Sequence, residues 1–193
     1  MTNQNLGSFH QGWLTGCRQV PSPNCHPRAQ GQSVDLVVIH NISLPPGEFG
    51  GDSVERLFTN SLDPNAHPYF GDIAQLEVSA HFFIRRDGEV VQFVSIDNCA
   101  WHAGVSEWRS RNRCNDFSIG IELEGTDTDI YSEAQYDVLE QLLVICRNAL
   151  PAIHENAIVG HSDIAPGRKT DPGPAFDWRE LERRLAVAGL PGI

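Results

Sequence analysis

Three short apolar runs constrain the fold of this chain more than any other feature. They cover residues 35–40 (DLVVIH), 118–123 (SIGIEL) and 157–160 (AIVG). Their length and their content of β-branched residues predict buried strands. Two of the runs lead directly into a histidine, since His40 closes the first and His161 follows the third. The sequence thus predicts a sheet with polar side chains where its strands end.

The clearest predicted helix covers residues 132–150. Ser132 and Gln135 form a capping-box pattern at its start, an apolar stripe at helical spacing follows, and Pro151 stops it. Other predicted segments are a short helix or turn followed by an extended arm in 1–30, a helix in 52–60 and a loop in 61–75. A final predicted helix starts near Asp177 and ends before Gly189.

The pair Asp87-Gly88 predicts a hairpin between strands in 78–84 and 89–94. Helices and strands are mixed along the chain, and a central sheet covered by helices on both sides is the natural packing. Because the hairpin requires an antiparallel pair, the sheet should be mixed. We therefore expect an α/β fold with a central mixed β-sheet flanked by helices. The 193 residues suit a single domain over 1–193.

The formal net charge of −11 argues against nucleic acid or an anionic membrane as the main partner. A local cluster of Arg109, Arg111 and Arg113 runs against that global sign. The N-terminus lacks the basic and apolar regions of a signal peptide, and no stretch is apolar enough to span a bilayer. The five cysteines are odd in number and form no CxxC pair, which favours reduced thiols and a cytoplasmic protein. A lost leader sequence is the alternative.

His40, His161 and Asp171 form a candidate metal site. Strand ends that face loops are where open α/β sheets place their sites, and Asp171 lies ten residues after His161 in a Pro/Gly-punctuated loop. Two imidazoles and one carboxylate leave a fourth zinc position open for water or substrate. The ligand types favour zinc, although not uniquely. The spacing alone is a weak signal, because a histidine at a strand end is more often structural.

Glu122 and Lys169 are candidate catalytic residues. Glu122 ends an apolar strand, where a carboxylate is costly without a partner, and a pKa raised by burial suits general acid–base catalysis. Lys169 could stabilise an oxyanion. The alternatives are a strand-end glutamate that faces water and an ordinary solvated loop charge beside Arg168.

Trp101 and His102 form an exposed pair that could line a groove, although such a tryptophan is more often partial core. His81, inside the predicted strand 78–84, is expected to be a core histidine or a group behind the metal ligands. Cys114 has no base near it in the sequence, so a catalytic thiol is a poor hypothesis.

Several long motifs resemble AmpD-type 1,6-anhydro-N-acetylmuramyl-L-alanine amidases, which belong to the wider zinc amidase group with the peptidoglycan-recognition fold. The resemblance runs from about Gly12 to Trp178, which places the catalytic core at about 12–180. The motifs that carry it are VVIHNISLPPGEFGG, DPNAHPYF, VSAHFFIRRDGEVVQFV, AWHAGVS, RCNDFSIGIELEGTD and GHSDIAPGRKTDPGPAFDW.

The resemblance implies a cytoplasmic enzyme of cell-wall recycling that cleaves the amide between the lactyl group of anhydro-N-acetylmuramic acid and L-alanine. Its substrate would be a small muropeptide, and no obligate protein partner is implied. Cleavage would also lower the muropeptide signal that induces a chromosomal β-lactamase. The family's single zinc ion would be bound by His40, His161 and Asp171, with Glu122 and Lys169 as its catalytic residues.

Asn41, Trp101, His102 and Arg113 are the candidates for sugar and peptide recognition. Arg113 could pair with peptide carboxylates. Glu77 stands where the family carries a basic residue, which puts one peptide contact in doubt. Two other functions stay open at this point. One is a muropeptide-binding module without catalysis, and the other is a periplasmic amidase that acts on intact wall.

Overall fold

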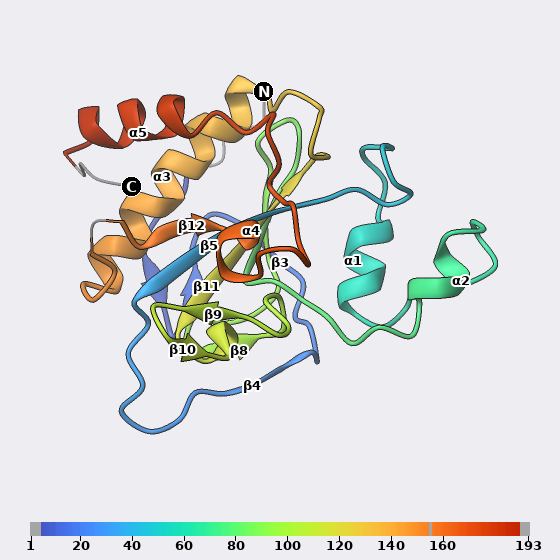
Figure 1. Cartoon of the computed structure of the whole chain (residues 1–193), viewed down its shortest axis with the longest axis horizontal. Coiled ribbons are helices and arrows are strands. Elements are labelled where there is room, and N and C mark those ends of the chain that lie inside the picture. The colour runs from blue at the N-terminus through green and yellow to red at the C-terminus, as the bar shows by residue number, and fades with distance from the viewer. Residues whose placement is uncertain (1–4, 155, 190–193) are drawn as a thin grey trace.

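A computed structural model describes residues 5–154 and 156–189. Its centre is a six-stranded sheet (Figure 1). The strands are parallel to their neighbours except for one antiparallel pair, β6 and β7, which forms the predicted hairpin through Asp87 and Gly88. The prediction of a mixed sheet is therefore confirmed. The strand order is β12 (Ile158–Gly160), β5 (Leu36–Ile42), β11 (Ser118–Glu124), β6 (Phe82–Ile84), β7 (Val90–Gln92) and β3 (Arg18–Gln19).

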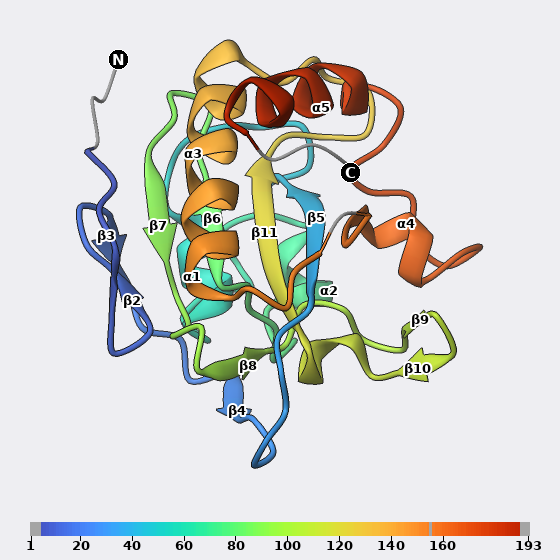
Figure 2. The same ribbon diagram turned by 90° about the vertical axis from the view of Figure 1, so that its left-hand side faces the viewer.

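Two helices cover one face of this sheet (Figure 2). Helix α3 (Glu133–Ala149) begins with the predicted capping box, in which the backbone N–H of Gln135 donates to Ser132 Oγ. The buried side-chain amide of Gln135 also donates to carbonyls at the ends of β6 and β11. Helix α5 (Trp178–Val187) packs beside α3, and Asp177 caps its N-terminus.

Shorter helices lie on the opposite face. Leu57 and Phe58 of α1 (Ser53–Phe58) and Phe70 of α2 (Phe70–Ile73) pack with sheet residues of β6 and β7. Arg18 of β3 holds α1 to the sheet by a two-pronged ion pair with Glu55. Helix α4 (His161–Ile164) follows β12 directly. Helices therefore flank both faces, as the sequence predicts.

At the N-terminus the structure has turns and extended segments, so of the two predicted alternatives the short helix is wrong. Residues 5–30 contain short strands and no helix: β1 (Phe9–His10) pairs with β2 (Trp13–Leu14), and β3 joins the edge of the sheet. The backbone at Gln11 and Gly12 has positive φ, which is incompatible with a helix, and the side chain of Gln92 binds Leu14 N and the Gly12 carbonyl. Residues 1–4 of this predicted segment lie outside the described part of the chain.

The remaining elements are small. The predicted loop 61–75 contains α2, and the final helix starts after Asp177 and ends before Gly189, as predicted. None of the helices in the described residues is long and apolar enough to span a bilayer. The other strands and the 3₁₀ helix are β4 (Cys25–Pro27), β8 (Asn98–Ala100), β9 (Glu107–Trp108), β10 (Arg111–Asn112) and η1 (Cys114–Asp116).

Strand β11 has two chemically distinct faces. Ile119, Ile121 and Leu123 pack in the core beneath α3, because alternate side chains of a strand point to opposite faces. The other face carries the polar or small residues Ser118, Gly120, Glu122 and Glu124. All seven residues of the strand are buried, so this second face forms a polar layer inside the protein.

Candidate metal centre and active site

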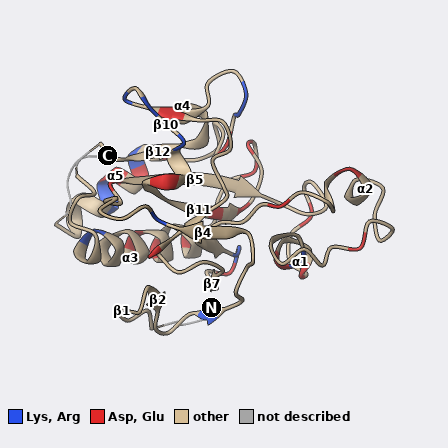
Figure 3. Ribbon diagram, turned by 90° about the horizontal axis from the view of Figure 1, so that it is seen from below, with Lys and Arg blue, Asp and Glu red and all other residues tan. Residues whose placement is uncertain are grey.

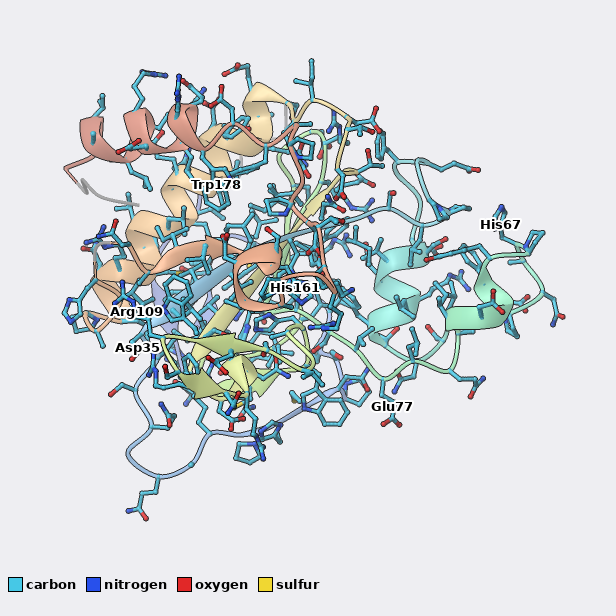
Figure 4. The ribbon with its side chains drawn as sticks, in the orientation of Figure 1. Asp35, His67, Glu77, Arg109, His161 and Trp178 are labelled. Atoms are coloured by element: carbon cyan, nitrogen blue, oxygen red, sulfur yellow. The ribbon has the colours of Figure 1, made fainter. Side chains whose placement is uncertain are left out.

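Three neighbouring parallel strands position the candidate site. His40 of β5 and Glu122 of β11 are direct partners in the strand register, so their side chains leave the same face. Gly160 of β12 pairs with Ile39, which places His161 next to His40. The sequence prediction that β5 ends at His40 is wrong, since the strand continues to Ile42. His161 is the first residue of α4 and lies near the centre of the molecule (Figure 4).

His40, His161 and Asp171 converge on one point. The two Nδ1 atoms lie 2.9 Å apart, and each lies 3.0 Å from Asp171 Oδ2. The backbone carbonyl of Asp171 accepts a hydrogen bond from Ser162 N, which ties the loop after α4 back to the start of that helix. A loop contact thus brings the carboxylate to the two strand-borne histidines.

The hydrogen bonds of His161 fix which of its nitrogens is free. Its Nε2 lies 3.1 Å from the carbonyl oxygen of Ala103, which can only accept, so Nε2 carries the proton. Arg168 also approaches Nε2, but its NH2 group donates to the carbonyls of Ala103 and Val105 at 2.7 Å each. In the tautomer with a single ring proton on Nε2, the other nitrogen, Nδ1, carries a free lone pair, and it faces Asp171.

This donor set fits a divalent metal. A bare imidazole nitrogen 3.0 Å from a carboxylate oxygen is repulsive unless a cation is shared between them. Burial lowers the pKa of His40 to about 4, which keeps its imidazole neutral and able to act as a ligand. His40, His161 and Asp171 could together hold one metal ion, with three ligand atoms close enough for a single site.

His102 lies behind His40. Its Nδ1 is 2.9 Å from His40 Nε2, and its own Nε2 is 3.0 Å from Ser118 Oγ. Burial, reinforced by the neighbouring histidines, lowers the pKa of His102 well below its usual value, so the ring is neutral. The sequence interpretation of His102 as an exposed groove residue is incomplete, because the ring lines the cavity but also contacts a candidate metal ligand.

Gly120 makes room for the ring of His102. A Cβ on this residue would lie 2.4 Å from His102 Cγ and 2.7 Å from its Nδ1. The backbone N–H of Gly120 donates to Nδ1 of the buried His81, whose Nε2 lies 3.0 Å from the Asn98 carbonyl. The expectation of a core histidine at position 81 agrees with this placement.

The close approach predicts that Gly120→Ala lowers stability. We expect a loss of about 1–3 kcal/mol in the free energy of unfolding, because the methyl group must displace the His102 ring in a packed interior. Urea denaturation measures it. The control Gly71→Ala should be neutral or slightly stabilising, since its nearest neighbour would be 3.9 Å away. An unchanged urea midpoint for Gly120→Ala would show that the ring is not tightly held.

Glu122 is the unpaired acid of the site. The described residues offer no hydrogen-bond partner to its buried Oε2. Burial raises its pKa well above the usual value, the charge of Asp171 raises it further, and Lys169 opposes both. A buried carboxylate that lacks a partner and faces a cavity is a candidate acid–base group.

A cavity of about 420 Å³ opens beside these residues. Its lining includes Glu122, His161, Lys169 and Asp171 together with apolar residues from α1, α2 and neighbouring loops. Asn41 lines it too, although its amide also donates to Asp127 Oδ1 and the Pro172 carbonyl. Trp101 also lines the cavity, and its indole N–H donates to His26 Nδ1, which fixes the orientation of the indole ring.

Basic residues gather on two loops beside β10 and α4 (Figure 3). Within them, Arg113 does not line the cavity: its Nε lies 3.0 Å from Asp116 Oδ2 and its side chain is largely exposed. Arg111 forms a two-pronged ion pair with Asp35. The role of Arg113 in substrate binding therefore stays a prediction without support from the cavity. Glu77 is exposed and lies at the periphery (Figure 4).

A second group of potential ligands, His26, Cys99 and Asp116, does not suit a metal. The indole N–H of Trp101 donates to His26 Nδ1, so the lone pair of that nitrogen is already used in a hydrogen bond. The Arg28 guanidinium lies 3.7 Å from Cys99 Sγ and opposes a further cation. Cys114 is fully buried and burial raises its thiol pKa, so it lacks the features of a nucleophile.

Comparison with known proteins identifies the family. Residues 30–174 match the profile of the N-acetylmuramoyl-L-alanine amidases. This chain belongs to that family. The amidase is 60% identical over 170 residues to the 1,6-anhydro-N-acetylmuramyl-L-alanine amidase AmpD of Escherichia coli K12, covering 88% of this chain and 92% of that protein. It is 47% identical to AmpD of Haemophilus influenzae, covering 91% and 95% of the two chains.

Solved structures agree with the sequence comparison. The amidase superposes on the crystal structure of a selenomethionine AmpD derivative with a TM-score of 0.90, at 55% identity and over 93% of this chain and 99% of that one. It also resembles Escherichia coli AmiD in complex with anhydro-N-acetylmuramic acid-L-Ala-D-γ-Glu-L-Lys, with a TM-score of 0.59 and 26% identity, over 96% of this chain and 66% of that one. The predicted zinc amidase-like α/β fold is confirmed.

Proposed function

We propose that this amidase hydrolyses the amide between the lactyl group of 1,6-anhydro-N-acetylmuramic acid and L-alanine in small muropeptides. The observation that carries the proposal is the convergence of three ligand atoms on one point, at a cavity that is lined by His161, Asp171 and a buried Glu122 whose Oε2 has no partner among the described residues. The names of the AmpD relatives supply the substrate class, and this chain covers nearly their whole length.

We propose one zinc ion as the cofactor, held by Nδ1 of His40, Nδ1 of His161 and Oδ2 of Asp171. When bound, zinc supplies Lewis-acid polarisation of the amide carbonyl and lowers the pKa of water that it binds. Two imidazoles and a single carboxylate leave a coordination position for substrate or water, as catalytic zinc sites require.

Glu122 acts as the general base and then as the general acid. It takes a proton from the attacking water while the new carbon–oxygen bond forms. It then delivers that proton to the L-alanine nitrogen as the carbon–nitrogen bond breaks. Burial raises the pKa of Glu122 above its usual value, and this direction favours the uptake and return of a proton by the carboxyl group.

Lys169 stabilises the negative charge that develops on the carbonyl oxygen. Lys169 lines the same cavity as Glu122 and Asp171, and it is the only lysine in the sequence. A fixed cation at a developing oxyanion lowers the barrier because it interacts more strongly with the transition state than with the neutral substrate.

We therefore expect Lys169→Met to lower kcat by about 10²–10³ while zinc content stays unchanged. Steady-state hydrolysis of an anhydromuramyl tripeptide measures the change. Arg109→Met is the matched control, because Arg109 is a basic residue that does not line the cavity, and its kcat should stay near that of the unchanged enzyme. If both variants lost the same activity, the effect would come from removing any positive charge and not from a specific role of Lys169.

The substrate assignment is tested by competition between substrates. We expect soluble 1,6-anhydromuropeptide to be cleaved far faster than whole sacculi, with free L-alanyl peptide as the product. Faster hydrolysis of intact wall would favour an enzyme that acts on the cell envelope instead.

We also propose a cytoplasmic place for this reaction, in the recycling of wall fragments. All five cysteines are free, and Cys99, Cys114 and Cys146 are buried in the packed interior, where oxidation would disrupt packing. Free thiols of this kind suit a reducing compartment. There, cleavage would lower the level of the anhydromuropeptides that induce β-lactamase.

A further inference from the structure

The Nε2 of His40 faces a partner that is unusual for a metal-binding histidine. The nitrogen that does not bind the metal normally donates to a carbonyl or a carboxylate, as His161 does to Ala103. His40 instead meets another imidazole, at 2.9 Å from His102 Nδ1. Either nitrogen of such a pair could be the donor, and the choice decides whether His40 Nδ1 is free to bind a metal.

Ser118 and Cys114 determine which of the two nitrogens is the donor in this contact. The Cys114 carbonyl can only accept, and Ser118 Oγ lies 2.6 Å from it, so the single hydroxyl proton of Ser118 points there. Ser118 Oγ must then accept from His102 Nε2, which lies 3.0 Å away. With its proton on Nε2, neutral His102 offers Nδ1 as an acceptor, and His40 Nε2 donates to it.

We infer that Ser118 and His102 are positioning residues that set the tautomer of His40 and leave its Nδ1 free for the metal. In this series of hydrogen bonds, His40 donates to His102, His102 donates to Ser118, and Ser118 donates to the Cys114 carbonyl. The three donor–acceptor distances lie between 2.6 and 3.0 Å. Neither Ser118 nor His102 belongs to the proposed metal ligands.

Two further features hold this arrangement in place. The side-chain oxygen of Asn115 accepts from the backbone N–H groups of both His102 and Ala103. The segment 114–118 therefore places the partner of His40 and the partner of His161 together. The absence of a side chain at Gly120 gives the His102 ring its position over β11. Both metal histidines are thus oriented from one short segment of the chain.

The inference rests on the proposed zinc site, and zinc affinity tests it by competition with a chromophoric chelator. We expect His102→Phe to weaken zinc binding by about 10–100-fold, because Phe keeps the ring but cannot accept the proton. His102→Asn should lose less than about tenfold, since its Oδ1 can take the place of Nδ1. Ser118→Ala should weaken binding in the same direction by a smaller factor. Ser95→Ala is the control: Ser95 is another buried serine, its hydroxyl hydrogen-bonds only with Gln11 and Asp97 among the described residues, and the variant should bind zinc as the unchanged protein does.

A second readout does not depend on how the variants fold. Long-range ¹⁵N–¹H NMR of the zinc-loaded unchanged protein should show the ring proton of His40 on Nε2 and that of His102 on Nε2. A ring proton on His102 Nδ1 in that protein, or unchanged zinc affinity in folded His102→Phe, would overturn the inference. If the unchanged protein bound no zinc through His40, the proposed function would fail instead.

Discussion

Replacing Glu122 with Gln is expected to lower turnover by about 10²–10⁴ without removing zinc. The change keeps the size of the side chain but removes the group that accepts and returns the proton. Because Oε2 has no partner among the described residues, the variant breaks no hydrogen bond at that atom, and its fold should persist. Steady-state hydrolysis of anhydromuropeptide measures kcat, and metal analysis of the same sample measures the zinc content.

Glu124→Gln is the matched control for this prediction. Glu124 lies two residues along the same face of β11, but it accepts from the backbone of Arg86 and Gly50 and does not line the cavity. Its loss should lower thermal stability while the folded enzyme keeps most of its turnover. Normal turnover in Glu122→Gln would mean that another group is the base.

Asp171→Ala is expected to have the largest effect on the metal. Loss of an outer contact typically costs 10–100-fold in metal affinity, so loss of a direct ligand should cost more than about 100-fold. The variant leaves the Nδ1 atoms of His40 and His161 2.9 Å apart with no carboxylate to help bind the cation. A competition titration for zinc measures the change.

Asp163→Asn serves as the control for Asp171. Asp163 lies in the same segment and accepts from the backbone N–H of Gly160, a role that the Asn side-chain oxygen can keep. Zinc affinity should be nearly unchanged in this variant. If Asp171→Ala bound zinc as tightly as the unchanged protein, Asp171 would not be a ligand.

Local patterns predicted much of the fold. The Asp87-Gly88 turn and the Ser132–Gln135 capping box act over a few residues, and both appear as expected. The sequence does not decide between a helix and a turn at the N-terminus, because the conformation there depends on a distant side chain, Gln92, which binds the backbone of residues 12 and 14. Polar patterning within 1–30 carries no information about that contact.

The candidate site, too, could be predicted from the sequence only in part. The strand runs indicated where His40, Glu122 and His161 would lie, and the structure brings them and Asp171 together. The part played by Ser118 could not be predicted, because its link to His40 passes through a loop residue, His102, that is far away in the sequence. The alternation of polar and apolar residues in 118–124 was the one available signal that β11 has a polar inner face.

Removal and return of the metal tests the central claim most directly. After exhaustive treatment with a chelator, the enzyme should release no L-alanyl peptide from 1,6-anhydromuropeptide, and one equivalent of zinc should restore the activity. Full hydrolysis by the metal-free protein would contradict the account.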